Sequence, residues 1–127
     1  MSIHRVPIAL IGFGNSARRL AELLLERAAQ IEKTYQVQIV CTAISTAKHG
    51  SIIADGIIDL AAALKLLKEN KPLTELKGSR SVRDSFAAIE ESGAEIMVET
   101  TPLNIKDGEP ARSHIELALN RLSLIHI

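Results

Sequence analysis

The stretch that decides the fold reads Val6-Pro7-Ile8-Ala9-Leu10-Ile11-Gly12-Phe13-Gly14-Asn15-Ser16-Ala17. Its first six residues form an apolar run closed by a glycine, which is typical of a strand buried on both faces. Pro7 cannot donate to a sheet ladder, but proline is tolerated near the first residue of a strand. From residue 15 to about residue 33, small and apolar side chains recur at three- and four-residue steps, which predicts an amphipathic helix after the glycines.

The glycine loop, residues 12–17, fits the pattern G-x-G-x-x-G/A. In that pattern the first glycine allows a tight turn, and the second lets the backbone approach a pyrophosphate. A small third residue, here Ala17, lets the helix pack closely on the strand. The phosphates bind free N–H groups at the helix N-terminus. Because the motif follows a strand and opens a helix, dinucleotide binding is favoured over a simple tight turn.

The rest of the chain alternates between strand-like and helix-like segments. We expect a strand at 37–44, a loop through 48–50, a helix at 60–70, a loop at 73–80, a helix at 81–92, a strand at 95–99, a loop at 100–108 and a helix at 109–121. This alternation predicts an α/β fold with three layers, a Rossmann-like parallel sheet and right-handed crossovers.

Composition narrows the class of protein. A chain of 127 residues is about one domain, which is short for an enzyme that needs both a cofactor domain and a substrate domain. The formal net charge is zero, so no basic field attracts a nucleic acid. The single cysteine, Cys41, excludes an internal disulfide and indicates a reducing cytoplasm. Neither a signal peptide nor an apolar run long enough to cross a membrane is expected.

The end of the second expected strand indicates which cofactor is bound. An acidic side chain there binds the ribose 2′-OH of NAD, whereas a basic one accommodates the 2′-phosphate of NADP. The sequence reads Ile44-Ser45-Thr46-Ala47-Lys48-His49, with no carboxylate, two hydroxyls that can donate hydrogen bonds, and the charge of Lys48. This favours NADP, with NAD as the alternative. A solvated loop is the alternative reading of Lys48 and His49.

Other polar residues give weaker signals. His4, His49, His114 and His126 lack the spacing of metal ligands, so no metal site is expected. Cys41 is interpreted as a small buried hydrophobe rather than a reactive thiol. His114 is expected at the surface or its boundary. Glu99 ends a strand near the expected cofactor, but we expect neither a Ser/His/Asp set nor a carboxylate pair around it.

Two stretches resemble homoserine dehydrogenases. One is the opening, from Val6 to Asn15. The more specific one is Val98-Glu99-Thr100-Thr101-Pro102-Leu103-Asn104-Ile105-Lys106-Asp107-Gly108-Glu109-Pro110-Ala111, a strand followed by Thr-Pro, an Asn loop and a Gly-Glu-Pro helix start. The resemblance covers residues 3–121.

The resemblance also implies a cofactor site. Phe13, Gly14, Asn15 and Ser16 would line the pyrophosphate. Thr100, Thr101 and Pro102 would lie near the ribose and nicotinamide, with an ordinary polar strand exit as the alternative. Thr46 stands where many members of this family carry an acid, which weakens the case for NAD.

The resemblance implies the reversible NAD(P)-linked interconversion of aspartate semialdehyde and homoserine, a step toward threonine, methionine and isoleucine. The cofactor carries the hydride while the protein supplies a proton. The family's catalytic lysine stretch, Asn-Lys-Gly-Pro-like, and its substrate domain have no counterpart in this sequence. We therefore assign no catalytic residue and expect the chain alone to be inactive. The parent enzyme is expected to bind a small-molecule substrate and to be a homo-oligomer.

The last six residues, Leu122-Ser123-Leu124-Ile125-His126-Ile127, depart from the family pattern. The codons CTG-TCT-CTT-ATA-CAC-ATC encode them and match a transposon-end sequencing adapter. We expect a partial NAD(P)-binding domain at 1–121, its sheet incomplete on the C-terminal side, and an adapter-derived tail at 122–127. A genuine short strand is the alternative for the tail. The alternatives for function are the binding domain of another amino-acid oxidoreductase, such as an aspartate dehydrogenase, and a stand-alone NADP-binding regulatory module.

Overall fold

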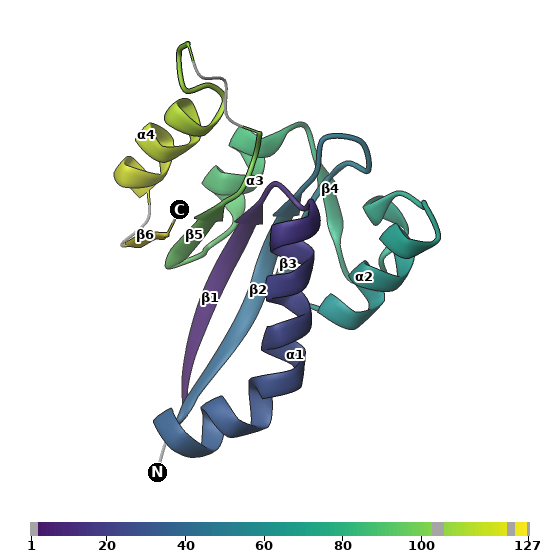
Figure 1. Cartoon of the computed structure of the whole chain (residues 1–127), viewed down its shortest axis with the longest axis vertical. Coiled ribbons are helices and arrows are strands. Elements are labelled where there is room, and N and C mark those ends of the chain that lie inside the picture. The colour runs from purple at the N-terminus through teal and green to yellow at the C-terminus, as the bar shows by residue number, and fades with distance from the viewer. Residues whose placement is uncertain (1–2, 103–105, 122–123, 127) are drawn as a thin grey trace.

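The computed structural model describes residues 3–102, 106–121 and 124–126, arranged around one sheet with the strand order β4-β3-β2-β1-β5-β6. Figure 1 shows the helices on both sides of this sheet. In chain order the elements are β1 (His4–Ile11), α1 (Asn15–Tyr35), β2 (Val37–Ser45), β3 (Ser51–Ile58), α2 (Leu60–Lys68), the 3-10 helix η1 (Leu73–Glu75), β4 (Arg80–Val82), α3 (Ser85–Glu91), β5 (Ile96–Glu99), α4 (Ala111–Arg121) and β6 (Leu124–His126).

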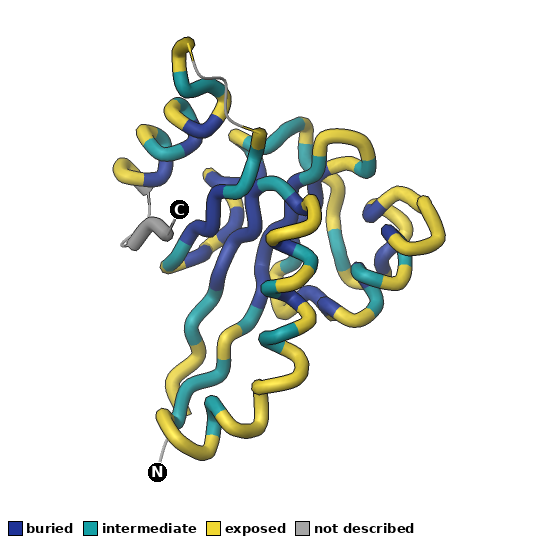
Figure 2. Tube along the Cα trace, viewed as in Figure 1, coloured by how far each residue is buried: buried dark blue, intermediate teal, exposed yellow. Residues whose placement is uncertain are grey.

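Two hydrophobic clusters, one on each face of the sheet, produce three layers. Ile8 and Leu10 of β1 join the cluster under α1, α2 and η1, whereas Ala9 and Ile11 join the cluster under α3 and α4. Successive side chains of a strand point to opposite faces, so one apolar run supplies both clusters. Figure 2 shows that β1 is exposed at its amino end and buried at its carboxyl end. The expected three-layer Rossmann-like fold is confirmed.

The sheet is mixed, which differs from the parallel sheet that the sequence predicts. β1 pairs in parallel with β2 and β5, but β3 runs antiparallel to β2, and β4 runs antiparallel to β3. Neither β3 nor β4 was among the expected strands. In β3 only Ser51, Ile52 and Ile53 form a buried run before exposed Asp55 and Gly56. A run this short, followed by a turn-like Asp-Gly pair, carries little periodic signal.

The helices follow the sequence prediction, apart from the start of α3. The expected helix at 81–92 begins only at Ser85, because Ser81 and Val82 belong to β4. Asp84 caps α3, with Oδ1 accepting a hydrogen bond from the Ala87 amide at 2.9 Å. An aspartate is among the residues preferred at this position because its side chain satisfies a free amide of the first turn.

The segment Leu124–His126 forms β6 and pairs in parallel with β5 at the edge of the sheet. This is the short strand weighed as the alternative reading of the chain's last residues. The adapter origin of residues 122–127 is a matter of DNA sequence and stays a prediction. Residues 122, 123 and 127 lie outside the described part of the chain.

Candidate dinucleotide-binding cleft

Three segments meet at the carboxyl ends of β1, β2 and β5 and enclose a cleft of about 410 Å³. In the sheet, β2 lies on one side of β1 and β5 lies on its other side, so the order of the strands reverses direction at β1. Open α/β sheets bind ligands at such a switch point. The cleft is lined by Gly12, Phe13, Gly14 and Arg18, by residues 45–49, by Thr100, Thr101 and Pro102, and by Ser85, Pro110 and His114.

Gly12 is the point at which these segments touch. Its amide donates to Ser45 O at 2.9 Å, and the Thr100 hydroxyl donates to Gly12 O at 3.0 Å. Its φ is +88°, and a Cβ there would lie 2.8 Å from both Thr100 C and Thr101 N. Only glycine combines this conformation with so close a backbone approach. The tight turn expected at the first glycine is therefore present.

Gly14 has a different environment. It is exposed in the cleft wall, and a Cβ there would meet nothing within 4 Å. Gly14 is the N-cap of α1, yet no side chain caps this helix and no acidic residue lies in its first turn. The first amides of a helix have no partner within the helix. The start of α1 therefore presents N–H groups and the positive end of its dipole next to an open wall, which suits an anion.

The remaining residues of the loop divide between the core and solvent. Phe13 is buried in the cluster under α1, so it lines the cleft with little exposed surface. Ala17 is 1% exposed and packs in the same cluster, as expected for the small third residue of the motif. Asn15 and Ser16 are exposed and are not among the residues that line the cleft.

The turn after β2 uses its hydroxyls internally. The Thr46 hydroxyl donates its single proton to Gly50 O at 2.8 Å and accepts the His49 amide at 2.7 Å. The Ser45 hydroxyl is buried against the Ser51 hydroxyl at 2.7 Å. The expectation that both hydroxyls can donate to a ligand is therefore wrong for Thr46, because its proton closes the turn. Lys48 is exposed and lines the cleft, as expected.

Sequence reasoning missed Arg18. Its Nε donates to Phe13 O at 3.0 Å, which holds the guanidinium beside the glycine loop, and the residue lines the cleft. Arg18 is not one of the small or apolar residues that predict the helix, so the helical pattern gives no reason to place it in a site. One signal in the sequence could have indicated that Arg18 belongs to the site. Arg18 lies one helical turn after Gly14, and the first turn of this helix flanks the cleft.

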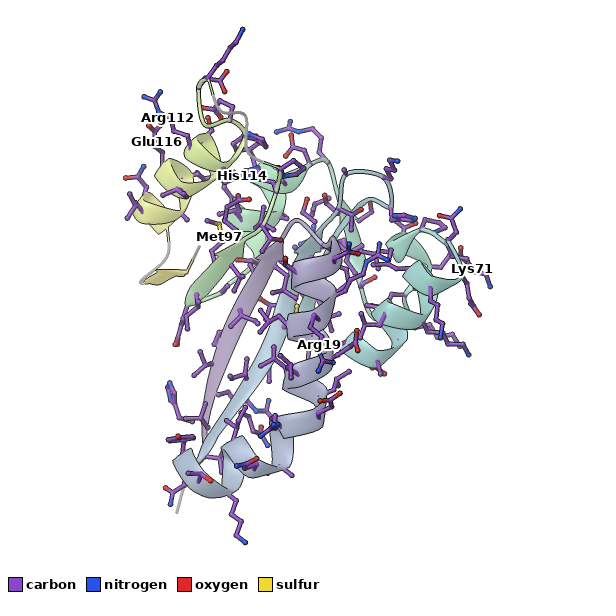
Figure 3. All side chains as sticks on the ribbon, viewed as in Figure 1. Arg19, Lys71, Met97, Arg112, His114 and Glu116 are labelled. Atoms are coloured by element: carbon purple, nitrogen blue, oxygen red, sulfur yellow. The ribbon has the colours of Figure 1, made fainter. Side chains whose placement is uncertain are left out.

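The structure overturns two expectations at the other side of the cleft. His114 is 1% exposed rather than at the surface or its boundary. The second expectation was that no Ser/His/Asp set forms around Glu99, which is 4% exposed. Figure 3 shows His114 on the inner side of α4, whereas Arg112 and Glu116 point outward. His114 Nδ1 lies 2.5 Å from Glu99 Oε2, and His114 Nε2 lies 2.6 Å from Ser85 Oγ. A Ser/His/Glu set does therefore form around Glu99, from residues that are far apart in the sequence.

The carboxylate of Glu99 is stabilised by hydrogen bonds. Burial raises its pKa, but hydrogen bonds from His114 and from the hydroxyl and amide of Thr101 hold the pKa below its usual value. The Thr101 amide donates to Glu99 Oε1 at 2.7 Å, and the Thr101 hydroxyl donates to the same oxygen. Glu99 therefore orders the first residues after β5, which line the cleft.

The described residues form neither a metal-ligand cluster nor a membrane-spanning helix. No three His, Cys, Asp or Glu side chains gather there as metal ligands. No described helix combines the length and hydropathy required to cross a bilayer. Cys41 is buried in the core, as expected.

Comparison with known proteins gives a consistent result. No protein-family model matches the chain. The chain is 28% identical over 110 residues to a homoserine dehydrogenase of Methanocaldococcus jannaschii, covering 87% of the chain and 32% of that protein. It is 32% identical over 114 residues to an NAD(+)-dependent homoserine dehydrogenase of Pseudomonas canavaninivorans, covering 90% of the chain and 32% of the relative. The chain thus spans about a third of the length of these relatives.

Solved structures show the same likeness in fold. A hyperthermophilic archaeal homoserine dehydrogenase mutant in complex with NADPH matches 91% of the chain and 33% of that structure, with a TM-score of 0.69 and 24% identity. The homoserine dehydrogenase of Thermoplasma acidophilum matches 95% of the chain and 34% of that structure, with a TM-score of 0.69 and 17% identity. By sequence and by its Rossmann-like fold, the chain is a homologue of homoserine dehydrogenases, matched over about a third of their length.

Proposed function

We propose that the cleft binds a nicotinamide dinucleotide. The pyrophosphate lies against Gly14 and the uncapped start of α1, with Phe13, Asn15 and Ser16 beside it and Ala17 packing beneath. The ribose and nicotinamide lie toward Thr100, Thr101 and Pro102. Residues 1–121 are accordingly proposed as an NAD(P)-binding domain, and residues 122–127 as a non-native tail.

The contrast between Gly12 and Gly14 carries this proposal. A side chain at Gly12 would collide with the backbone after β5, whereas a side chain at Gly14 would project into open space. Packing therefore requires the first glycine but not the second. A ligand that approaches the backbone at Gly14 explains it, because a pyrophosphate needs this space and the N–H groups beyond it.

We propose NADP rather than NAD as the preferred cofactor. Lys48 is exposed at the rim of the cleft, Arg18 lies in the wall near the glycine loop, and residues 45–49 contain no carboxylate. Basic side chains at this position accommodate a 2′-phosphate, whereas an acid binds the 2′-OH of NAD. The names of the relatives do not favour one cofactor, since one relative is called NAD(+)-dependent and one solved structure is a complex with NADPH.

The reaction that we propose is that of homoserine dehydrogenases, the interconversion of aspartate semialdehyde and homoserine for threonine, methionine and isoleucine biosynthesis in the cytoplasm. The bound cofactor supplies the hydride. The residues of this chain bind and orient it, and we assign none of them a catalytic role. A small-molecule substrate and self-association are proposed for the whole enzyme. The likeness to homoserine dehydrogenases favours this reading over an aspartate dehydrogenase or a regulatory module.

Titration of the purified chain with NADPH and with NADH, followed by the fluorescence of the reduced nicotinamide, tests the proposal. The chain contains no Trp, so the emission reports on the cofactor alone. We expect tighter binding of NADPH. Lys48→Glu should weaken NADPH binding and leave NADH binding nearly unchanged. Lys77→Glu is the control, since Lys77 is exposed in a loop outside the cleft. Tighter binding of NADH would refute the preference, and absence of binding to either would refute the function.

A further inference from the structure

A chain of hydrogen bonds links three separate segments behind the cleft wall. The Ser85 hydroxyl at the start of α3 contacts His114 Nε2 of α4 at 2.6 Å, and His114 Nδ1 contacts Glu99 Oε2 at the end of β5 at 2.5 Å. The second oxygen of Glu99 accepts both the amide and the hydroxyl of Thr101. Ser85, Thr101 and His114 all line the cleft. The chain therefore begins and ends at hydroxyls on the cleft wall.

Stability alone does not account for this network. The side chains of His114 and Glu99 are 2% and 1% exposed. Burying a carboxylate and an imidazole costs desolvation energy, and well-packed apolar residues of similar volume are often as stable or more stable. The packing around α4 is otherwise apolar. A polar network at this position, connected at both ends to the cleft, indicates a role in arranging the cleft.

The network determines where the hydroxyl protons point. A carboxylate only accepts hydrogen bonds, so His114 Nδ1–H donates to Glu99. With the ring proton on Nδ1 alone, Nε2 accepts the proton of the Ser85 hydroxyl. The Thr101 proton goes to Glu99 Oε1. Both hydroxyl protons are therefore used inside the protein. The two oxygens can offer a ligand only their lone pairs, so they act as acceptors.

The order hydroxyl, imidazole, carboxylate is also that of a serine hydrolase. Such an enzyme needs free N–H groups beside the serine to stabilise an oxyanion. The carboxylate of Asp84 instead takes the amides of Phe86 and Ala87, and Asp84 O accepts the Ala88 amide. The Thr101 amide is bound to Glu99. The described neighbours of Ser85 therefore do not provide an oxyanion hole, and the contacts favour recognition over nucleophilic attack.

We propose that His114 and Glu99 are positioning residues that hold the Ser85 and Thr101 oxygens as acceptors for the carboxamide NH₂ of the nicotinamide. A primary amide offers two N–H donors, which matches two acceptor oxygens. This inference rests on the proposed function, since it places the nicotinamide end of the cofactor on the side of the cleft formed by α3, α4 and the segment after β5.

The test compares NADP+ with its 3-acetylpyridine analogue, in which a methyl ketone replaces the amide and removes both N–H donors. Each displaces NADPH from the chain, and the loss of cofactor fluorescence measures its affinity. For the wild-type chain we expect NADP+ to bind about ten- to a hundredfold more tightly than the analogue, a ratio typical of two lost neutral hydrogen bonds. Ser85→Ala and Thr101→Val should each move the ratio toward one, by weakening NADP+ rather than the analogue.

Two variants of His114 separate positioning from general stability. In His114→Asn the amide takes the place of Nδ1, so it keeps a donor for Glu99 and loses Ser85. It should reduce discrimination to the level of Ser85→Ala, even where its melting temperature also falls. Ser113→Ala, on the same helix but outside the cleft lining, is the matched control and should keep the wild-type ratio.

The outcomes distinguish this inference from the function on which it rests. If the wild-type chain binds NADPH but does not discriminate between the two ligands, the inference is wrong and the function stands. The same holds if Ser85→Ala and Thr101→Val discriminate as well as the wild type. If the chain binds no dinucleotide, the proposed function fails and the inference fails with it.

Discussion

Gly12→Ala is the substitution whose effect the structure specifies best. A Cβ at this position lies 2.8 Å from Thr100 C and from Thr101 N, so the backbone after β5 has to move by about 0.6 Å to restore a 3.4 Å contact. The φ of +88° adds a conformational cost of about 1–2 kcal/mol for an L-residue. Overpacking against a backbone that cannot rotate away adds about 1–3 kcal/mol. The free energy of unfolding should therefore fall by about 2–5 kcal/mol.

Thermal and urea unfolding, followed by circular dichroism, measure this change. A loss of this size should lower the melting temperature by on the order of 10 °C in a chain of this length. Gly14→Ala is the matched control, since its Cβ meets nothing within 4 Å. It should lose only about 0.5–1 kcal/mol, because Ala is a poorer N-cap than Gly, yet weaken NADPH binding by filling the space that a pyrophosphate needs. A Gly12→Ala chain as stable as the wild type would refute the assignment of the first glycine to the strand contact.

Two further predictions concern buried titratable groups. Burial raises the pKa of Cys41 to about 12, so the native chain should react with a thiol reagent such as Ellman's reagent far more slowly than the urea-unfolded chain; equal rates would contradict the packing of β2. The pKa of Glu99 is lowered from 4.5, so its carboxylate contributes stability that is complete above about pH 4.5 and is lost as the pH falls through the depressed folded value. Glu99→Gln should flatten the acid side of a plot of unfolding free energy against pH; an unchanged acid slope would show that other carboxylates dominate.

The parts of the candidate site that consist of residues adjacent in the sequence were predictable. Gly12, Gly14 and Ala17 follow a strand and open a helix, so their spacing along the chain is also their spacing in the cleft. The segment from Thr100 to Pro102 follows a buried strand, and parallel strands bring their carboxyl ends to the same edge of a sheet. Lys48 was predicted for the same reason.

The residues that sequence reasoning misplaced depend on contacts between distant segments. His114 lies 15 residues from Glu99 and 29 from Ser85, and no periodic pattern relates the three. An isolated histidine on an amphipathic helix gives no sign of whether it faces solvent or a buried carboxylate. The antiparallel β3 was missed because three of its eight residues are exposed and its Asp55-Gly56 pair resembles a turn.

The sequence by itself determined the α/β class, the glycine turn and the end of the sheet at which a dinucleotide is expected to bind. These features depend on residues adjacent in the chain, where side-chain size, backbone freedom and hydrophobic period act locally. Only the tertiary structure decided the mixed direction of the sheet and the Ser85–His114–Glu99 network. Each depends on which distant polar groups must satisfy one another once solvent is excluded. That requirement exists only in the folded core, because in the unfolded chain water satisfies every one of these groups.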